Sequence, residues 1–268
     1  MNYALTIATA VLLCYGTIAG YLYFFQRNIL YIPNKNLGMP STYQLYNMGA
    51  LSLKTPDKVS VTAWYAPPPN DQAPVIVYFH GNAGNLSDRH EKFAKFLENP
   101  VGLLALSYRG YGTSQGSPTE HGLYEDARTV INYLINKGIN QERIVLYGES
   151  LGSGVAVQMA TEYPTVKALV LEAPYTSITR RAQEKYPFIP IGLLLKDPFD
   201  SLSKITQIHA PLLVFHGEKD DVIPIWHGKM LYEQATVSKE IHTFPNVGHT
   251  DFDLTKISHM TMDFINKH

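Results

Sequence analysis

The chain has 268 residues, of which 45% are hydrophobic and 17% are charged. A chain of this length and composition can bury one large core, so we expect a single α/β domain rather than two. The formal net charge of −1 provides no basic surface, and nucleic acid is not an expected partner. A single cysteine, Cys14, excludes a disulfide framework, and the sequence has no Cys/His spacing typical of a metal site. Neither a metal nor another cofactor is expected.

An uncharged apolar segment begins the chain. Residues 4–25 contain no charged side chain, and a helix of this length at about 1.5 Å per residue crosses a hydrocarbon core of roughly 30 Å. Aromatic residues gather at its far end, before Arg27, as in an interfacial belt. This predicts a membrane anchor over residues 1–27. A cleaved signal peptide is the alternative, which the absence of Lys or Arg before the apolar run disfavours.

The orientation and the association of this segment stay open. Arg27 and Lys35 follow the span and favour a cytoplasmic domain under the positive-inside rule, but two charges do not decide the side of the membrane. Gly16 and Gly20 form a G-x-x-x-G pattern that can pack two helices, which makes dimerisation possible. The same stripe also arises by chance in membrane spans.

After the anchor, strand patterns alternate with helix patterns. Residues 31–46 are polar and interrupted by prolines, which predicts a linker, and residues 59–65 alternate like a half-buried antiparallel strand. Five apolar runs, separated by helical stretches, then indicate buried strands: residues 75–79, 101–106, 143–147, 168–171 and 212–215. This is the βαβ pattern of a parallel sheet.

The first long helix of this region carries a start signal. Ser117 and Glu120 have the spacing of a capping box, with Pro118 at the first helical position. We therefore expect the helix that includes residues 123–134 to begin at Pro118.

The most specific motif is Gly148-Glu149-Ser150-Leu151-Gly152, a G-x-S-x-G sequence between an apolar strand and a helix of small residues. Glycines on both sides allow the sharp turn that exposes a nucleophilic serine. The hydroxyl of Ser150 would lie at a helix N-terminus, where developing negative charge is favoured. The backbone amide of Leu151 is then free to donate to an oxyanion.

Two later segments supply an acid and a histidine. Asp220 and Asp221 follow the end of a predicted strand, and His249 lies in a loop after the strand-like residues 240–244. A neutral His249 would take the proton from Ser150 while a carboxylate holds its tautomer. His80 and His216 precede glycines at strand ends and are more typical of structural histidines.

These motifs resemble those of the α/β-hydrolase fold serine hydrolases, in the single-pass membrane-anchored branch. The resemblance covers nearly the whole chain through segments that run in family order: residues 25–33, 79–85, 108–114, 148–152, 216–224 and 248–249. It implies a mostly parallel sheet flanked by helices, within a hydrolase domain over residues 28–268.

The resemblance also implies roles for individual residues. It assigns the catalytic positions to Ser150, Asp220 and His249, the acid being the one three residues after the glycine of its loop. It places the backbone amides of Asn82 and Leu151 in the oxyanion hole.

An insertion at about residues 174–209 is expected to form a short cap over the serine. Its residues 186–195 are strongly apolar, so an acyl or other hydrophobic group could lie beneath it. The alternative is a pair of surface helices that completes the core.

Taken together, the motifs predict a membrane-anchored serine hydrolase that acts through an acyl-enzyme on carboxylic esters or thioesters. A serine peptidase of short peptides would use the same triad. A non-catalytic binding protein on a hydrolase scaffold is the alternative from a different class. The expected partners are a small-molecule or acyl substrate and, through the N-terminal helix, a membrane.

Overall fold

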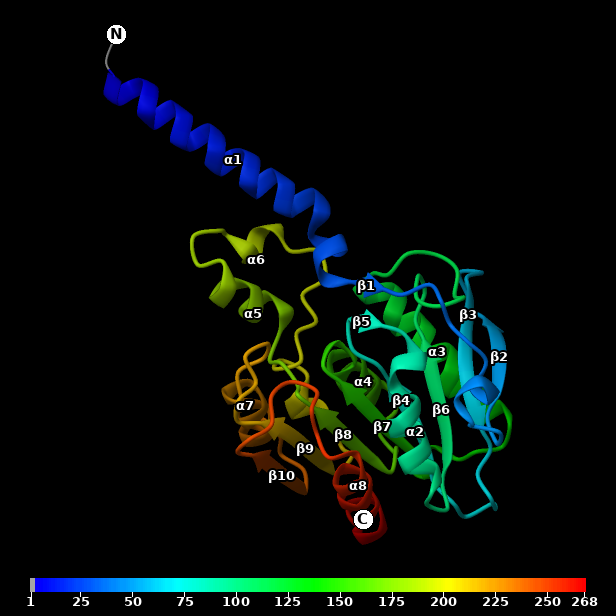
Figure 1. The fold of residues 1–268 in the computed structure, drawn as a ribbon. Coiled ribbons are helices and arrows are strands. Elements are labelled where there is room, and N and C mark those ends of the chain that lie inside the picture. Colours follow the sequence, from blue (N-terminus) through cyan, green and yellow to red (C-terminus); the bar gives the residue numbers. More distant parts are fainter. Residues whose placement is uncertain (1–2) are drawn as a thin grey trace.

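The computed structural model describes residues 3–268, which contain an eight-stranded sheet (Figure 1). Its strands are β2 (Gly49–Lys54), β3 (Ser60–Ala66), β4 (Val75–Phe79), β6 (Gly102–Ser107), β7 (Ile144–Glu149), β8 (Ala168–Glu172), β9 (Leu212–Gly217) and β10 (Lys239–Phe244). The strand order is β10-β9-β8-β7-β4-β6-β3-β2, and every pair from β10 to β6 is parallel. Only β3 and β2 run antiparallel to their neighbours. The predicted, mostly parallel sheet is confirmed.

Helices cover both faces of the sheet. They are α2 (His90–Leu97), α3 (Glu120–Asn136), α4 (Leu151–Glu162), α7 (Trp226–Gln234) and α8 (Leu254–Lys267). Successive side chains of a strand point to opposite faces, so Val77 and Tyr78 of β4 belong to two separate apolar cores. Val77 shares its core with α3, α4 and α7, whereas Tyr78 packs with α2 and α8. Burial on both faces explains the uninterrupted apolar runs in the sequence.

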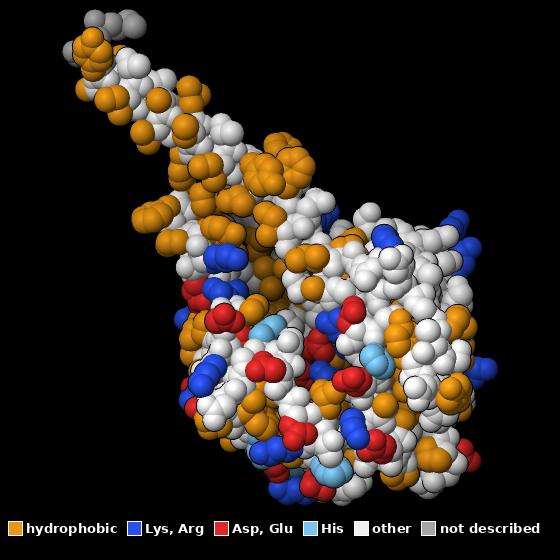
Figure 2. All heavy atoms as spheres, viewed as in Figure 1, with side chains coloured by type: hydrophobic (Ala, Val, Ile, Leu, Met, Phe, Trp, Pro, Cys, Tyr) orange, Lys and Arg blue, Asp and Glu red, His pale blue; other side chains and the backbone are white. Residues whose placement is uncertain are grey.

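The N-terminal helix α1 (Tyr3–Leu30) extends away from the domain (Figure 1). It is long and apolar enough to cross a membrane, and none of its apolar window is buried. Hydrophobic side chains cover this helix in Figure 2, whereas charged side chains gather on the domain. The helix leads directly into β1 (Ile32–Pro33), which pairs in parallel with β5 (Ala83–Gly84). The end of α1 is thus fixed beside the loop that follows β4.

The segment between β8 and β9 carries two short helices, α5 (Ile178–Lys185) and α6 (Ile191–Leu194), which lie beside α1 (Figure 1). We call residues 174–209 the cap. Hydrogen bonds connect the cap with α1 through Tyr15 and Phe188, Gln26 and Leu194, and Arg27 and Asp197. The cap therefore packs against the N-terminal helix as well as against the domain.

The predicted start of α3 is wrong by two residues. The helix begins at Glu120, and the hydroxyl of Thr119 caps it by accepting a hydrogen bond from the amide of Gly122 at 2.9 Å. A capping box would need the Glu120 carboxylate to accept from the backbone of Ser117. This carboxylate instead accepts from the amide of Phe199 in the cap at 2.8 Å. A long-range contact thus replaces the local one.

Candidate active site

Ser150 occupies the turn between β7 and α4. Its backbone has φ 50° and ψ −116°, in the left-handed region that non-glycine residues rarely adopt. A Cβ at Gly148 would lie 2.5 Å from the carbonyl oxygen of Gly152, and one at Gly152 would collide with the carbonyl of Phe79. Both flanking glycines are thus required by close backbone packing, which holds the serine in its strained turn.

Ser150, His249 and Asp220 form a continuous hydrogen-bonded chain. The Nε2 atom of His249 lies 2.9 Å from the Oγ atom of Ser150, and its Nδ1 atom lies 2.8 Å from Oδ2 of Asp220. The three residues follow β7, β10 and β9 at the carboxyl edge of the sheet. This is the spacing of a nucleophile, a base and a group that orients the base.

The carboxylate of Asp220 is held ionised by its neighbours. Burial raises its pKa, but hydrogen bonds from His216, His249 and the amide of Ile223 lower it more, so that the pKa lies below the usual range. The Oδ1 atom accepts from the amides of Val222 and Ile223 at 2.9 and 2.7 Å. Oδ2 therefore faces the imidazole of His249 at 2.8 Å, with Nε2 of His216 at 3.4 Å.

The neighbouring Asp221 has a different environment. Its side chain is exposed and lines a cavity beneath the cap. Within residues 3–268 it makes no hydrogen bond to His249. The structure therefore distinguishes the two acids, which lie in one loop.

The other histidines near the strand ends do not reach the serine. His80 is buried, its Nδ1 atom lies 2.7 Å from the carbonyl oxygen of Gly81, and burial lowers its pKa to about 3. His216 donates from Nε2 to the carbonyl of Ile223 at 2.8 Å. His216 thereby fixes the loop that presents Asp220, as expected of a structural histidine.

The loop after β4 is held beside the serine. Its Asn82 accepts through its carbonyl from the hydroxyl of Tyr111 at 2.6 Å and from the amide of Ile32 at 3.0 Å. Its side chain donates to the carbonyl of Leu30 at 3.1 Å. In the part of the chain that the structure describes, the backbone amides of Asn82 and Leu151 donate no hydrogen bond. Both amides are thus available to a ligand.

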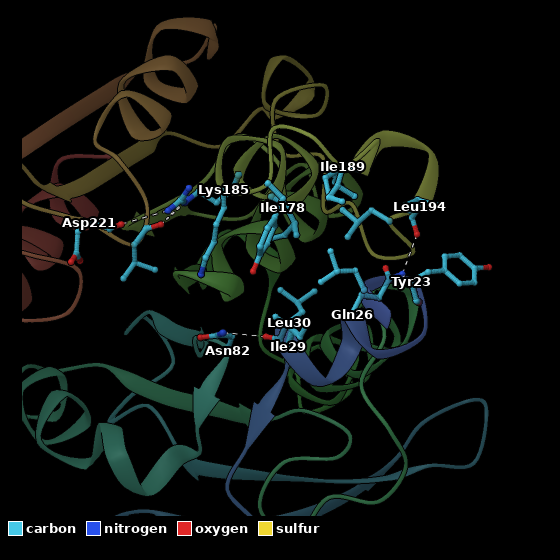
Figure 3. Close-up of a pocket in the computed structure, with 17 residues that line it drawn as sticks. Tyr23, Gln26, Ile29, Leu30, Asn82, Ile178, Lys185, Ile189, Leu194 and Asp221 are labelled. Carbon is cyan, nitrogen blue, oxygen red and sulfur yellow. Dashed lines mark hydrogen bonds between the residues drawn. The ribbon is translucent and has the colours of Figure 1, made fainter. Parts of the chain in front are cut away.

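Two adjacent cavities lie above this site. The smaller, of about 110 Å³, is lined by Asn82, Ser150 and Leu151 among others. The larger, of about 380 Å³, lies between α1 and the cap (Figure 3). The residues that line both cavities are Leu30, Asn82, Ile178, Arg181 and Val222.

Sequence reasoning missed a buried charge cluster beneath the serine. The Nζ atom of Lys92 lies 2.9 Å from Glu149 and 2.8 Å from Glu172, and Arg89 binds the other oxygen of Glu149 at 2.8 Å. Burial raises the pKa of Glu149, but Lys92 and Arg89 lower it more, to well below the usual range. The carbonyl of Glu172 accepts from the amide of Ser150 at 2.9 Å. The cluster therefore supports the turn that carries the serine.

Among residues 3–268, no group of three or more His, Cys, Asp or Glu side chains is placed to hold a metal ion. The sequence signal for the charge cluster was an acid at the end of each of two apolar strands, Glu149 of β7 and Glu172 of β8.

Comparison with known proteins identifies the family. Residues 74–200 match the α/β hydrolase fold family. An uncharacterized protein of Mycobacterium tuberculosis is 33% identical over 254 residues, which cover 94% of this chain and 90% of that protein. Protein bem46 of Schizosaccharomyces pombe is 31% identical and covers 87% of this chain and 82% of its own length. The chain belongs to the α/β-hydrolase family.

This confirms the resemblance given by the motifs, and the apolar helix α1 fits the membrane-anchored branch. The alpha/beta hydrolase domain-containing protein WAV2 of Arabidopsis thaliana is 30% identical over 82% of this chain and 79% of its own. A solved esterase of Pyrococcus furiosus superposes with a TM-score of 0.73 at 17% identity, over 89% of this chain and 97% of that one. The latter likeness shows the shared fold.

Proposed function

We propose that this α/β hydrolase is a membrane-anchored serine hydrolase that cleaves carboxylic esters or thioesters through an acyl-enzyme. The hydrogen-bonded chain from Ser150 through His249 to Asp220 carries the proposal. In it Ser150 is the nucleophile, His249 is the general base, and Asp220 holds the imidazole in the reactive tautomer. The backbone amides of Asn82 and Leu151 form the oxyanion hole.

The first half of the reaction transfers the acyl group. The Oγ atom of Ser150 bonds to the carbonyl carbon while Nε2 of His249 takes its proton, and the carbonyl electron pair moves to the oxygen. The amides of Asn82 and Leu151 stabilise this oxyanion. When the carbonyl reforms, the bond to the leaving oxygen or sulfur breaks, and His249 gives that atom the proton.

The second half releases the acid. A water molecule attacks the acyl carbon as His249 takes its proton, a second oxyanion forms, and the bond to Ser150 breaks. His249 returns the proton to Oγ, which restores the starting state. Asp220 stays ionised throughout and stabilises the imidazolium in both halves.

The surroundings of the serine favour an acyl group over a peptide. The cavity between α1 and the cap is bounded mainly by aliphatic side chains, including Ile178, Ile189 and Leu194. An apolar site of this kind stabilises an acyl chain by burial, whereas a peptide backbone needs hydrogen-bonding partners.

The membrane part of the proposal rests on α1. The helix has the length and composition of a span, and no residue of its apolar window is buried. We place residues 1–27 in a single-pass anchor and residues 28–268 in the hydrolase domain, with the cap at about 174–209.

A matched pair of serines tests the proposal. Ser150→Ala should abolish labelling by a fluorophosphonate probe and lower ester hydrolysis by roughly 10⁶-fold, because the nucleophile is lost. Ser153→Ala in the first turn of α4 removes a buried hydroxyl that has no hydrogen-bond partner among the described residues. It should leave labelling and hydrolysis near those of the unsubstituted protein. Undiminished labelling of Ser150→Ala would reject the assignment.

A further inference from the structure

The N-terminal helix forms one wall of the larger cavity, and the cap forms the other (Figure 3). From α1 come Leu22, Ile29 and Leu30, and from the cap come Ile178, Ala182 and Ile189. The volume of about 380 Å³ lies in the range of small-molecule sites, roughly 300–1,000 Å³. A segment that composition marks as an anchor thus also encloses a binding cavity.

The inner end of this cavity lies at the catalytic serine. Leu30 and Asn82 line both the large cavity and the small one that reaches Ser150. The Asn82 side chain donates to the Leu30 carbonyl, so the end of α1 is fixed to the loop of the oxyanion hole. A chain lying in the large cavity would therefore present its terminal carbonyl to Ser150.

The outer end lies higher along α1. Leu22 precedes Leu30 by two turns, which places it roughly 12 Å farther along the helix axis. Beyond it, the Tyr15 hydroxyl donates to the Phe188 carbonyl at the tip of the cap at 2.8 Å. Phe188 is 86% exposed, and Leu193 is 87% exposed. Such apolar exposure, beside the apolar part of α1, is typical of a surface that contacts a membrane.

Basic and aromatic side chains mark the level of the membrane surface. The Nζ atom of Lys196 lies 4.3 Å from the ring centroid of Tyr23, near the base of the cap. Lys185 lines the cavity on the opposite side. Aromatic rings and lysines gather at the boundary between headgroups and acyl chains. With the boundary at Tyr23, the tip residue Phe188, which accepts from Tyr15 farther along the span, reaches into the acyl region.

We propose that this cavity binds the acyl chain of a membrane lipid ester, which enters from the bilayer between α1 and the cap tip. The ester carbonyl then reaches Ser150, and α1 serves both as an anchor and as a wall of the acyl site. This inference rests on the proposed serine hydrolase function and names its substrate class.

Two fluorophosphonates, one with a short and one with a long alkyl chain, test the cavity in the full-length protein reconstituted in phosphatidylcholine vesicles. Ala182→Phe fills the cavity, whereas Gln183→Phe adds the same ring at the next position of α5, outside the lining. The rate of labelling at Ser150 by the long-chain probe should fall at least tenfold in Ala182→Phe and stay unchanged in Gln183→Phe. Both variants should react normally with the short-chain probe.

A second pair tests entry from the bilayer. Phe188→Asp places a charge at the cap tip, where a charged side chain is costly in hydrocarbon. It should slow labelling by the long-chain probe severalfold and leave labelling by the short-chain probe unchanged. Tyr46→Asp changes a residue that is 78% exposed before β2 and lines neither cavity, and it should affect neither rate.

The outcomes separate the two proposals. If Ser150 is labelled but no variant changes the dependence on chain length, the acyl site is wrong and the hydrolase function stands. If Ser150 reacts with neither probe, the serine hydrolase function fails, and the acyl site fails with it. If Ala182→Phe responds and Phe188→Asp does not, the acyl site stands and entry beside the cap tip is rejected.

Discussion

Asp220 and Asp221 are adjacent in sequence, yet only Asp220 contacts the imidazole of His249, at 2.8 Å. Asp220→Asn should lower kcat by about 10⁴-fold, because the uncharged amide neither holds the reactive tautomer nor stabilises the imidazolium. Asp221→Asn should change kcat by less than about threefold, since its side chain is exposed. Steady-state hydrolysis of one activated ester by both variants checks this. A larger loss in Asp221→Asn would contradict the assigned acid.

Buried His80 should make stability depend on pH. Its folded-state pKa of about 3 lies below the unfolded value of about 6.5, so the unfolded chain takes up a proton first as the pH falls. The free energy of unfolding therefore declines below about pH 6.5, by about 1.4 kcal/mol per pH unit, until about pH 3.

His80→Asn keeps a donor toward the Gly81 carbonyl and removes this proton uptake. Between pH 7 and pH 5 it should lose about 2 kcal/mol less unfolding free energy than the unsubstituted protein. His121→Asn on the exposed face of α3 is the control and should leave the pH dependence unchanged. Thermal unfolding at both pH values measures the difference, and parallel pH curves for His80→Asn would disprove the explanation.

For single residues, the sequence predicts the placement of those side chains that belong to a local motif. The turn at Ser150 needs its own flanking glycines, and the nearness of Asp220 to His249 follows from the fold that those motifs indicate. The contact of Lys92 with Glu149 joins residues 57 positions apart without any motif. Such a pair becomes visible only once α2 is packed against β7.

Among the elements, α2 connects the surface with the charge cluster below the serine. Lys92 faces inward and pairs with Glu149 and Glu172, whereas Lys95 on the same helix is paired with Glu98 at the surface. Lys92→Met should destabilise the protein by about 3–5 kcal/mol, because two carboxylates stay buried without their shared cation.

Lys95→Met should lower the free energy of unfolding by less than about 1 kcal/mol, as expected for the loss of an exposed ion pair. Denaturant unfolding of both variants in detergent gives the comparison. Equal stability of Lys92→Met and Lys95→Met would show that the buried cluster adds nothing to the fold.

Strands were easier to predict than helix ends. The parallel strands β4, β6, β7, β8 and β9 are buried on both faces, so their apolar runs are continuous and unambiguous, whereas the parallel edge strand β10 is only half-buried. β2 gave no such signal, since it is an edge strand with mostly exposed or half-buried residues. The start of α3 was misplaced because Glu120 binds the amide of Phe199 in the cap, a contact 79 positions away that no local pattern contains.

For the whole molecule, the main question is how α1 relates to the domain. Composition places a boundary near residue 27, where charges reappear, whereas the helix continues to Leu30. Gln26 donates to the carbonyl of Leu194, 168 positions away. The contact between α1 and the cap produces no hydrophobic periodicity in the sequence that could predict it. The boundary between anchor and domain at residue 27 stays a proposal.

Two truncations distinguish the role of α1 as a membrane anchor from its role as a wall of the cavity. Removal of residues 1–21 deletes most of the apolar span but keeps Leu22 to Leu30, so the cavity retains its wall. Removal of residues 1–30 also deletes Arg27, which donates at 2.7 Å to the carboxylate of Asp197, a side chain only 4% exposed. It further frees the Asn82 side chain, which bonds the Leu30 carbonyl.

Both truncated proteins should lose membrane attachment, which fractionation measures. The shorter truncation should hydrolyse a soluble short-chain ester within about threefold of the full-length rate. The longer one should unfold about 2–12 °C lower, because a buried carboxylate left without its partner costs about 1–3 kcal/mol. It should also hydrolyse the ester more slowly, since the loop of the oxyanion hole loses its support. Equal melting temperatures and rates for the two truncated proteins would show that α1 only anchors the enzyme.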